Sequence, residues 1–217
     1  RTRGDRELVS SAVQEIQQSK QPVIVAGGGV NWSLAADQVM QLAELTGAAI
    51  VTSYGRADAV PNDHPQFLGH LGRLGAEEAI SAIQQSDLII AAGTRLGQST
   101  TFYDNRFIPE GAKIIQIEID PKELGRNYPI TVGIEGDVKS VLEDILEGLQ
   151  GSGELNLDWK TTVLSQHVAR NTRLDTELTI DSYPMKPQRV YAELRKVMPR
   201  DAIIALDAGL APNFGQD

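Results

Sequence analysis

Two hydrophobic patterns alternate along the first 150 residues. Continuous apolar runs, which are typical of strands buried on both faces, occur at residues 22–26, 48–52, 87–92, 113–119 and 130–134. Apolar residues recur at helical spacing over residues 5–19, 33–45, 76–85 and 137–149, with Ser33 expected to cap the second of these helices. This alternation with short links predicts an α/β fold, a parallel sheet with helices on both faces.

Two stretches interrupt the alternation. Residues 53–75 carry many Gly, Pro, Asn and Asp residues, and this composition predicts an irregular loop. The Gln-Gly-Ser-Gly run at 150–153 ends the regular pattern. We therefore predict a domain over residues 1–150.

A second, shorter pattern follows that boundary. It predicts a helix over 155–173, a polar connector over 175–186, a helix over 187–197 and a buried strand over 202–206. We therefore expect a linker with a helix over 151–183 and a truncated second α/β unit over 184–217, because one helix and one strand cannot bury both faces of a sheet.

Composition narrows the possible functions. Twenty Lys and Arg residues against 29 Asp and Glu give a net charge of −9, which disfavours binding to nucleic acid. There is no cysteine, as in many proteins of reducing compartments, and we expect a cytoplasmic protein. No apolar run reaches the roughly 20 residues that span a bilayer, so no membrane association is expected. The sequence starts at Arg1 rather than Met, which we interpret as a chain entered in mid-sequence.

The first predicted strand is followed by Gly27, Gly28 and Gly29. Glycines allow the backbone to approach a phosphate closely. However, Trp32 stands where the usual dinucleotide fingerprint needs a small residue. A tight strand-to-helix turn without a ligand is the alternative explanation of these glycines.

Three further strand ends carry candidate ligand groups. Arg95, after Gly93, suits a phosphate or a planar ring, or else bonds loop carbonyls. Glu118 suits ribose hydroxyls, whereas Asp120 is expected to cap the turn before Pro121. Asp137 is a natural helix N-cap, and capping alone would explain it.

No catalytic residue and no metal ligand is predicted from these patterns. His64, His70 and His167 lack a metal-ligand spacing, and we expect structural or surface roles for them. The sequence contains neither a Gly-x-Ser-x-Gly elbow nor a phosphate loop that ends in Gly-Lys-Ser/Thr.

The order of five segments is more specific than any one of them. The segments are residues 20–30, His64-Pro65 with Leu68-Gly69, residues 86–95, residues 113–121 and Gly136-Asp137. Together they resemble the central domain of thiamine diphosphate-dependent enzymes, particularly the acetolactate (acetohydroxyacid) synthase-like branch. Residues 186–194 and 202–209 look like the opening of the family's third domain.

The resemblance implies a Rossmann-like, deoxyhypusine synthase-like NAD/FAD-binding fold. It also implies a parent lyase or transferase that acts on 2-oxo acids or related carbonyl donors. In that family thiamine diphosphate and Mg²⁺ are bound between the first and third domains of a homo-oligomer. The partners of this chain would then be the missing domains of the parent, and the chain alone is expected to be inactive.

The resemblance also assigns residues. Gly27, Gly28, Gly29, Gly93 and Arg95 match positions at the FAD pyrophosphate, Glu118, Ile119, Asp137 and Val138 match its adenosine half, and Gly209 and Leu210 match the loop near thiamine diphosphate. The synthases carry further Asp and Arg residues where Gly97, Gln98 and Ser99 stand here. The nucleotide therefore stays open between FAD, another adenine nucleotide and none. At residues 210–213 the Gln-His-Gln type run of the synthases is replaced by Leu-Ala-Pro-Asn, so related decarboxylases, carboligases and acetyltransferases stay open beside acetolactate synthesis.

Two other interpretations remain. One is a stand-alone NAD- or nucleotide-binding module of the deoxyhypusine synthase or sirtuin-like kind, although the zinc cysteines of sirtuins are absent. The other is a purely structural spacer domain without a ligand.

Overall fold

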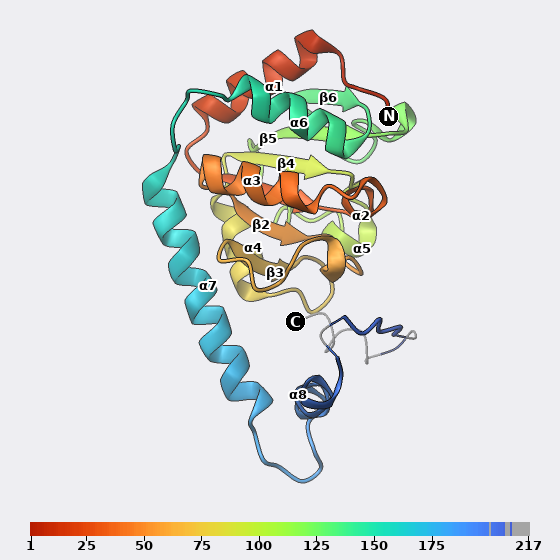
Figure 1. The fold of residues 1–217 in the computed structure, drawn as a ribbon, viewed down its shortest axis with the longest axis vertical. Helices are drawn as coiled ribbons and strands as arrows, with labels where there is room; N and C mark the ends of the chain where they lie inside the picture. Colours follow the sequence, from red (N-terminus) through yellow and green to blue (C-terminus); the bar gives the residue numbers. More distant parts are fainter. Residues whose placement is uncertain (200, 207–208, 210–217) are drawn as a thin grey trace.

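The centre of the molecule is a six-stranded parallel sheet, seen in a computed structural model that describes residues 1–199, 201–206 and 209. The strand order is β3-β2-β1-β4-β5-β6 (Figure 1). The strands are β1 (Pro22–Ala26), β2 (Ala49–Thr52), β3 (Phe67–His70), β4 (Leu88–Ala92), β5 (Lys113–Glu118) and β6 (Val132–Glu135). The predicted α/β parallel architecture is therefore confirmed.

Helices cover both faces of this sheet, as predicted. The helices are α1 (Arg6–Gln18), α2 (Gly28–Ser33), α3 (Ala36–Thr46), α4 (Glu77–Gln85), α5 (Gln98–Thr101), α6 (Val138–Gly148), α7 (Leu157–Leu178) and α8 (Pro187–Val197), with short 3₁₀ turns η1 (Ala57–Ala59) and η2 (Pro121–Glu123). Alternation along each strand decides which face a side chain joins. Ile24 and Ala26 of β1 pack in the core under α1, α3 and α6, whereas Val23 and Val25 pack in the core under α4 and the start of α7.

The chain changes direction across the sheet after β3. It runs outward from β1 through β2 to β3, then returns past β1 to β4 and continues to β6. β1 is hydrogen-bonded to β2 on one side and to β4 on the other. The connection after β1 leads toward one edge of the sheet, and the connection after β4 leads toward the other. A crevice therefore forms between the carboxyl ends of β1 and β4, which is the usual ligand position in open α/β sheets.

Strand β3 lies inside the stretch that was predicted to be irregular, so that prediction is wrong there. The four residues of β3 are buried and pair with β2 through Ile50–Phe67 and Thr52–His70, with a register shift between the two pairs. Gly69 sits at this irregularity with φ of +105°. A short strand interrupted by a left-handed glycine carries no continuous apolar run, which is why the pattern did not indicate it.

The loop between β1 and α3 also differs from the prediction. Ser33 is the last residue of α2 and donates its hydroxyl to the Gly29 carbonyl at 2.6 Å, so it does not cap α3. Leu34 follows with φ of +55°, and α3 begins at Ala36. One turn of helix thus precedes α3 where one continuous helix from Ser33 was expected.

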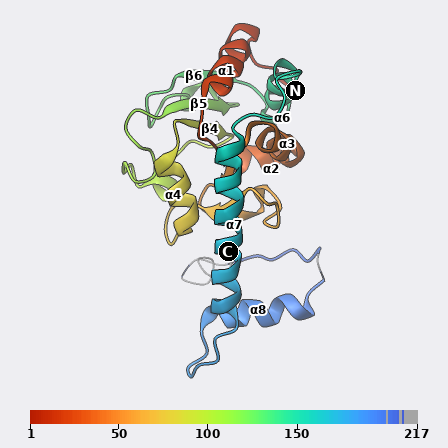
Figure 2. The same ribbon diagram turned by 90° about the vertical axis from the view of Figure 1, so that its left-hand side faces the viewer.

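Helix α7 is longer than predicted, and its first half packs on the sheet. Trp159 and Val163 join the core under α4, and the Trp159 indole Nε1 donates to the Pro22 carbonyl at 3.0 Å. The packing continues to Arg170, which is buried against Phe67 of β3, and to Arg173, which pairs with Glu78 of α4 at 2.9 Å. The end of the helix extends past the sheet to α8 (Figure 2). Helix α8 was predicted correctly and has no buried residue.

Residues 202–206 do not form the predicted buried strand. Ile203 is 99% exposed, and among the described residues no strand pairs with this segment. A strand needs a neighbour to satisfy its backbone groups. The division at 150 and 183 stays a prediction. Among the described residues, no helix is both long and apolar enough to cross a membrane.

Candidate functional site

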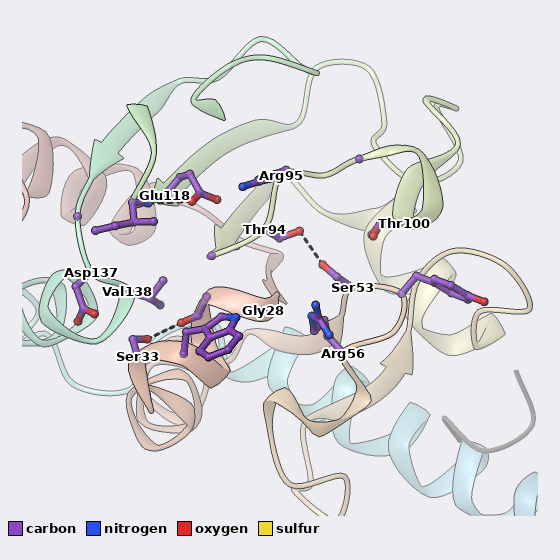
Figure 3. A pocket seen from close by; sticks show the side chains of 17 residues that line it. Gly28, Ser33, Ser53, Arg56, Thr94, Arg95, Thr100, Glu118, Asp137 and Val138 are labelled. Carbon is purple, nitrogen blue, oxygen red and sulfur yellow. Dashed lines mark hydrogen bonds between the residues drawn. The ribbon is translucent and has the colours of Figure 1, made fainter. Parts of the chain in front are cut away.

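A cavity of about 550 Å³ opens at the carboxyl edge of the sheet. Its walls are the segments that follow β1, β2, β4, β5 and β6 (Figure 3). It therefore lies at the crevice between β1 and β4, where the topology predicts a ligand.

The loops after β1 and β4 pack against each other at the base of this cavity. The Gly27 amide donates to the Ala92 carbonyl and the Gly29 amide to the Gly93 carbonyl, both at 2.9 Å. A Cβ atom on Gly27 would lie 2.3 Å from the Gly93 oxygen, and one on Gly29 would lie 2.6 Å from the Gly93 Cα. Gly27 and Gly29 are thus required by backbone packing, whatever ligand binds.

Gly28 has a different environment. A Cβ atom on Gly28 would meet only the side chain of Arg56, with Nε at 2.8 Å and Cζ at 3.6 Å. The Arg56 side chain therefore crosses from the loop after β2 to the turn after β1. Both residues line the cavity.

Two hydroxyls join the loops after β2 and β4. The oxygens of Ser53 and Thr94 lie 2.7 Å apart, and both residues are buried (Figure 3). In such a pair one hydroxyl donates to the other, so one proton stays available for a further acceptor. The base of the cavity can therefore donate a hydrogen bond to a ligand oxygen.

Arg95 lies in the loop after β4, and hydrogen bonds from the side chain of Gln116 hold this loop in place. The buried amide of Gln116 donates to the carbonyls of Thr94 and Glu123 at 3.3 and 3.2 Å and accepts from the Gly125 amide at 2.9 Å. The Arg95 Nε lies 3.8 Å from the Glu123 carboxylate, and the arginine side chain is 61% exposed. It extends toward the side of the cavity where Glu118 lies (Figure 3). Its backbone is fixed while its guanidinium is accessible to an anion.

The acidic side of the cavity follows β5 and β6. Glu118 is 7% exposed, and one of its carboxylate oxygens accepts from the Ile119 amide at 3.0 Å. Asp137 caps α6 by accepting from the Ser140 amide at 3.2 Å and pairs with Arg1 at 3.5 Å. Asp120 accepts from the Lys122 amide, so its expected capping role is confirmed.

The three histidines do not line this cavity. His64 contacts Glu44 at 3.4 Å, and His167 contacts the Phe67 carbonyl at 2.7 Å. His70 is fully buried in β3. In the part of the chain that the structure describes, no group of three or more His, Asp or Glu could hold a metal ion.

Similarity to known proteins agrees with this geometry. Residues 9–145 match the family described as "Thiamine pyrophosphate enzyme, central domain". The chain belongs to this family. The dependence on thiamine diphosphate that the sequence predicts is therefore a property of the family, and the alternative of a stand-alone NAD-binding module is not favoured.

Several curated relatives of this thiamine pyrophosphate family chain are enzymes. Sulfoacetaldehyde acetyltransferase from Alcaligenes xylosoxydans is 34% identical over 96% of this chain and 39% of its own length. A probable acetolactate synthase large subunit from Methanocaldococcus jannaschii is 35% identical over 93% of this chain and 34% of its own. An acetolactate synthase from Mycobacterium avium is 43% identical over 64% of this chain and 22% of its own. The chain spans well under half the length of these relatives.

Eight of the residues proposed from the family resemblance line the same cavity. They are Gly28, Gly29, Gly93, Arg95, Glu118, Ile119, Asp137 and Val138. Gly27 lies at the base in the turn that packs on Gly93. Gly209 does not line the cavity, and Leu210 lies outside the described residues.

Other lining residues were not predicted from the sequence. They are Trp32, Ser33, Ser53, Tyr54, Arg56, Thr94, Gly97, Thr100 and Gly136. Trp32 is 89% exposed although it lines the cavity. Ser53 and Arg56 follow a buried strand directly, so the rule that ligands bind at carboxyl ends of strands would have indicated them.

Proposed function

We propose that this chain provides the central domain of a thiamine diphosphate-dependent lyase or transferase. The enzyme would act on 2-oxo acids or related carbonyl donors. The family match and the acetolactate synthase and acetyltransferase relatives support this proposal. A homo-oligomeric enzyme in the cytoplasm, with its other domains as the partners of this one, belongs to the same proposal.

Within that enzyme, we propose that the cavity binds an adenine nucleotide, FAD or another. The observation that carries this is the convergence of Arg95 and Glu118 on one cavity above the packed glycine turns. A guanidinium pairs with phosphate oxygens, and a carboxylate accepts hydrogen bonds from ribose hydroxyls. The diphosphate would lie at Gly28, Gly29, Gly93 and Arg95, and the adenosine would lie at Glu118, Ile119, Asp137 and Val138.

The described residues do not fit a Mg²⁺ site, since no suitable group of His, Asp or Glu is present among them. We propose that Mg²⁺ and thiamine diphosphate are held by other parts of the enzyme, with Gly209 and Leu210 in the loop near thiamine diphosphate. When bound, thiamine diphosphate supplies the electron sink for carbonyl chemistry. The expectation that this chain is inactive by itself stays part of the proposal.

Nucleotide binding is tested by thermal unfolding of the purified chain with FAD, ADP and NAD. A ligand at 100 times its dissociation constant stabilises the folded state by about 2.7 kcal/mol, which shifts the midpoint of a domain of this size by several degrees. We expect FAD, ADP or both to stabilise. The double variant Arg95→Ala, Glu118→Gln should lose this shift.

Arg106→Ala is the matched control. Arg106 is exposed and pairs with Asp104 at 3.0 Å, and it does not line the cavity. This variant should keep the shift. If none of the three ligands stabilises the chain, the adenine nucleotide proposal is wrong. If NAD stabilises it more than FAD and ADP, the NAD-binding alternative replaces the proposed FAD or ADP site.

The enzymatic proposal is tested on the longer enzyme. We expect consumption of a 2-oxo acid such as pyruvate that requires added thiamine diphosphate and Mg²⁺, followed by product analysis. Activity that does not depend on thiamine diphosphate would contradict the proposal.

A further inference from the structure

The charged groups of the cavity follow the order of the strands. Glu118 is the last residue of β5, Arg95 follows β4, Gly28 follows β1 and Arg56 lies in the loop after β2. Neighbouring strands are about 4.8 Å apart, so the strand ends that carry Glu118 and Arg56 are roughly 14 Å apart. Glu118 thus lies at one end of this order and the Arg56 guanidinium at the other, with Arg95 between them and next to Glu118.

Arg56 differs from Arg95 in its partners. The NH1 group of the Arg56 side chain donates a hydrogen bond to the Gly55 carbonyl at 3.1 Å. The ion pairs formed between described residues include Arg95 with Glu123 but none with Arg56. The Arg56 side chain is exposed and lies against Gly28. It therefore places a positive charge beside the turn after β1 that pairs with no carboxylate of the described residues.

The position of Arg56 beside Gly28 is suitable for binding one phosphate of the proposed nucleotide. A ribose with two phosphates extends over roughly two strand spacings, about 10 Å. With the ribose at Glu118, the first phosphate lies over the end of β4 near Arg95. The second phosphate then lies over the end of β1, at Gly28, where Arg56 and the Ser53–Thr94 hydroxyl pair converge.

The charge and the space beside Gly28 and Arg56 favour the terminal phosphate of a ligand. A terminal phosphate monoester carries about −1.5 to −2 charges at pH 7, whereas a phosphate bridged on both sides carries one. The Arg56 side chain also lies beside Gly28, with its Nε 2.8 Å from the position of a Cβ atom added there. A dinucleotide that continued past the second phosphate in this direction would have to displace it.

We infer that the cavity selects a nucleoside diphosphate over a dinucleotide such as FAD, and that Arg56 binds its terminal phosphate. This inference rests on the proposed adenine nucleotide site and specifies which ligand that site takes.

The test is isothermal titration calorimetry of the 217-residue chain with ADP, AMP and FAD. We expect ADP to bind about tenfold or more tightly than either AMP or FAD, because only ADP presents a terminal phosphate to Arg56. Arg56→Ala should weaken ADP binding about tenfold and leave AMP binding within twofold. Arg56→Lys should restore part of the ADP affinity, since a lysine keeps the charge without the planar fork. Arg106→Ala should change none of the three affinities, and circular dichroism verifies that each variant is folded.

Four outcomes would overturn the inference. FAD binding as tightly as ADP removes the selectivity, and an Arg56→Ala variant that keeps full ADP affinity removes the role of Arg56; both leave the adenine nucleotide site intact. An equal loss of ADP and AMP affinity in Arg56→Ala would show a general electrostatic effect instead of recognition of the terminal phosphate. Failure of all three ligands to bind would overturn both this inference and the proposed nucleotide site.

Discussion

Substitution of Gly29 by alanine tests whether the glycine turn after β1 is required by packing or by the ligand. The added methyl group would lie 2.6 Å from the Gly93 Cα and 3.2 Å from the Gly93 oxygen. Both are backbone atoms, so the two loops must separate to make room. Their separation also weakens the hydrogen bond from the Gly29 amide to the Gly93 carbonyl.

The expected destabilisation follows from these two contacts. Overpacking in a tightly packed region costs about 1–3 kcal/mol, and loss of the backbone hydrogen bond adds about 1 kcal/mol. Helix propensity returns up to about 1 kcal/mol, since Gly29 lies in α2 and alanine is the better helix former. We therefore expect Gly29→Ala to lower the free energy of unfolding by about 1–3 kcal/mol.

Two other glycines that line the cavity provide matched controls. The assay for all three variants is urea unfolding followed by circular dichroism. The methyl group of Gly28→Ala would meet only the flexible Arg56 side chain, and that of Gly97→Ala would meet nothing within 4 Å. Both variants should stay within about 1 kcal/mol of the parent chain. The packing argument fails if Gly29→Ala is as stable as Gly97→Ala, or if Gly28→Ala loses as much stability as Gly29→Ala.

Three further substitutions test other contacts. Trp159→Phe removes the hydrogen bond to the Pro22 carbonyl and should lower the free energy of unfolding by about 1–3 kcal/mol in urea; an unchanged midpoint would show that α7 is not held by this bond. Gln116→Leu removes three hydrogen bonds under the Arg95 loop and should weaken ADP binding in calorimetry besides lowering stability, whereas a purely structural role would leave the affinity unchanged. Burial raises the pKa of Asp87, but hydrogen bonds from the Ser19 hydroxyl and from two backbone amides outweigh it, so the pKa lies below its ordinary value of 3.8. The carboxylate therefore stabilises the fold above that value, and the contribution is lost as pH falls through the folded pKa. Asp87→Asn should destabilise the chain more at pH 7 than at pH 3, and a penalty independent of pH would contradict this.

The sequence pattern predicted the sheet where strands are continuous and fully buried. Residues 22–26 and 88–92 form such strands, because parallel strands covered on both faces need apolar side chains at every position. The pattern did not predict β3, whose register shifts at Gly69. It wrongly predicted a strand at 202–206, since an apolar run forms a strand only where a neighbouring strand pairs with it.

The sequence indicated the cavity residues that belong to familiar motifs but not those brought there by tertiary contacts, and their role in binding stays a prediction. Gly28, Arg95 and Glu118 follow strand ends in recognisable patterns, and the structure brings them to one cavity. The importance of Arg56 depends on its side chain crossing from the loop after β2 to the turn after β1. That proximity follows from the strand order β2-β1-β4, which hydrophobic periodicity alone does not specify.

The two tryptophans of this chain lie in opposite environments, which gives it two intrinsic optical probes. Trp159 lies on α7 and is 4% exposed in the core between this helix and the sheet, whereas Trp32 is 89% exposed at the cavity. Emission from Trp159 should shift to longer wavelength when α7 separates from the sheet, while emission from Trp32 should change when a nucleotide occupies the cavity. In Trp159→Phe the remaining signal reports occupancy, and in Trp32→Phe it reports the packing of α7. Ligand binding and unfolding can therefore be followed separately in one cuvette without an attached dye.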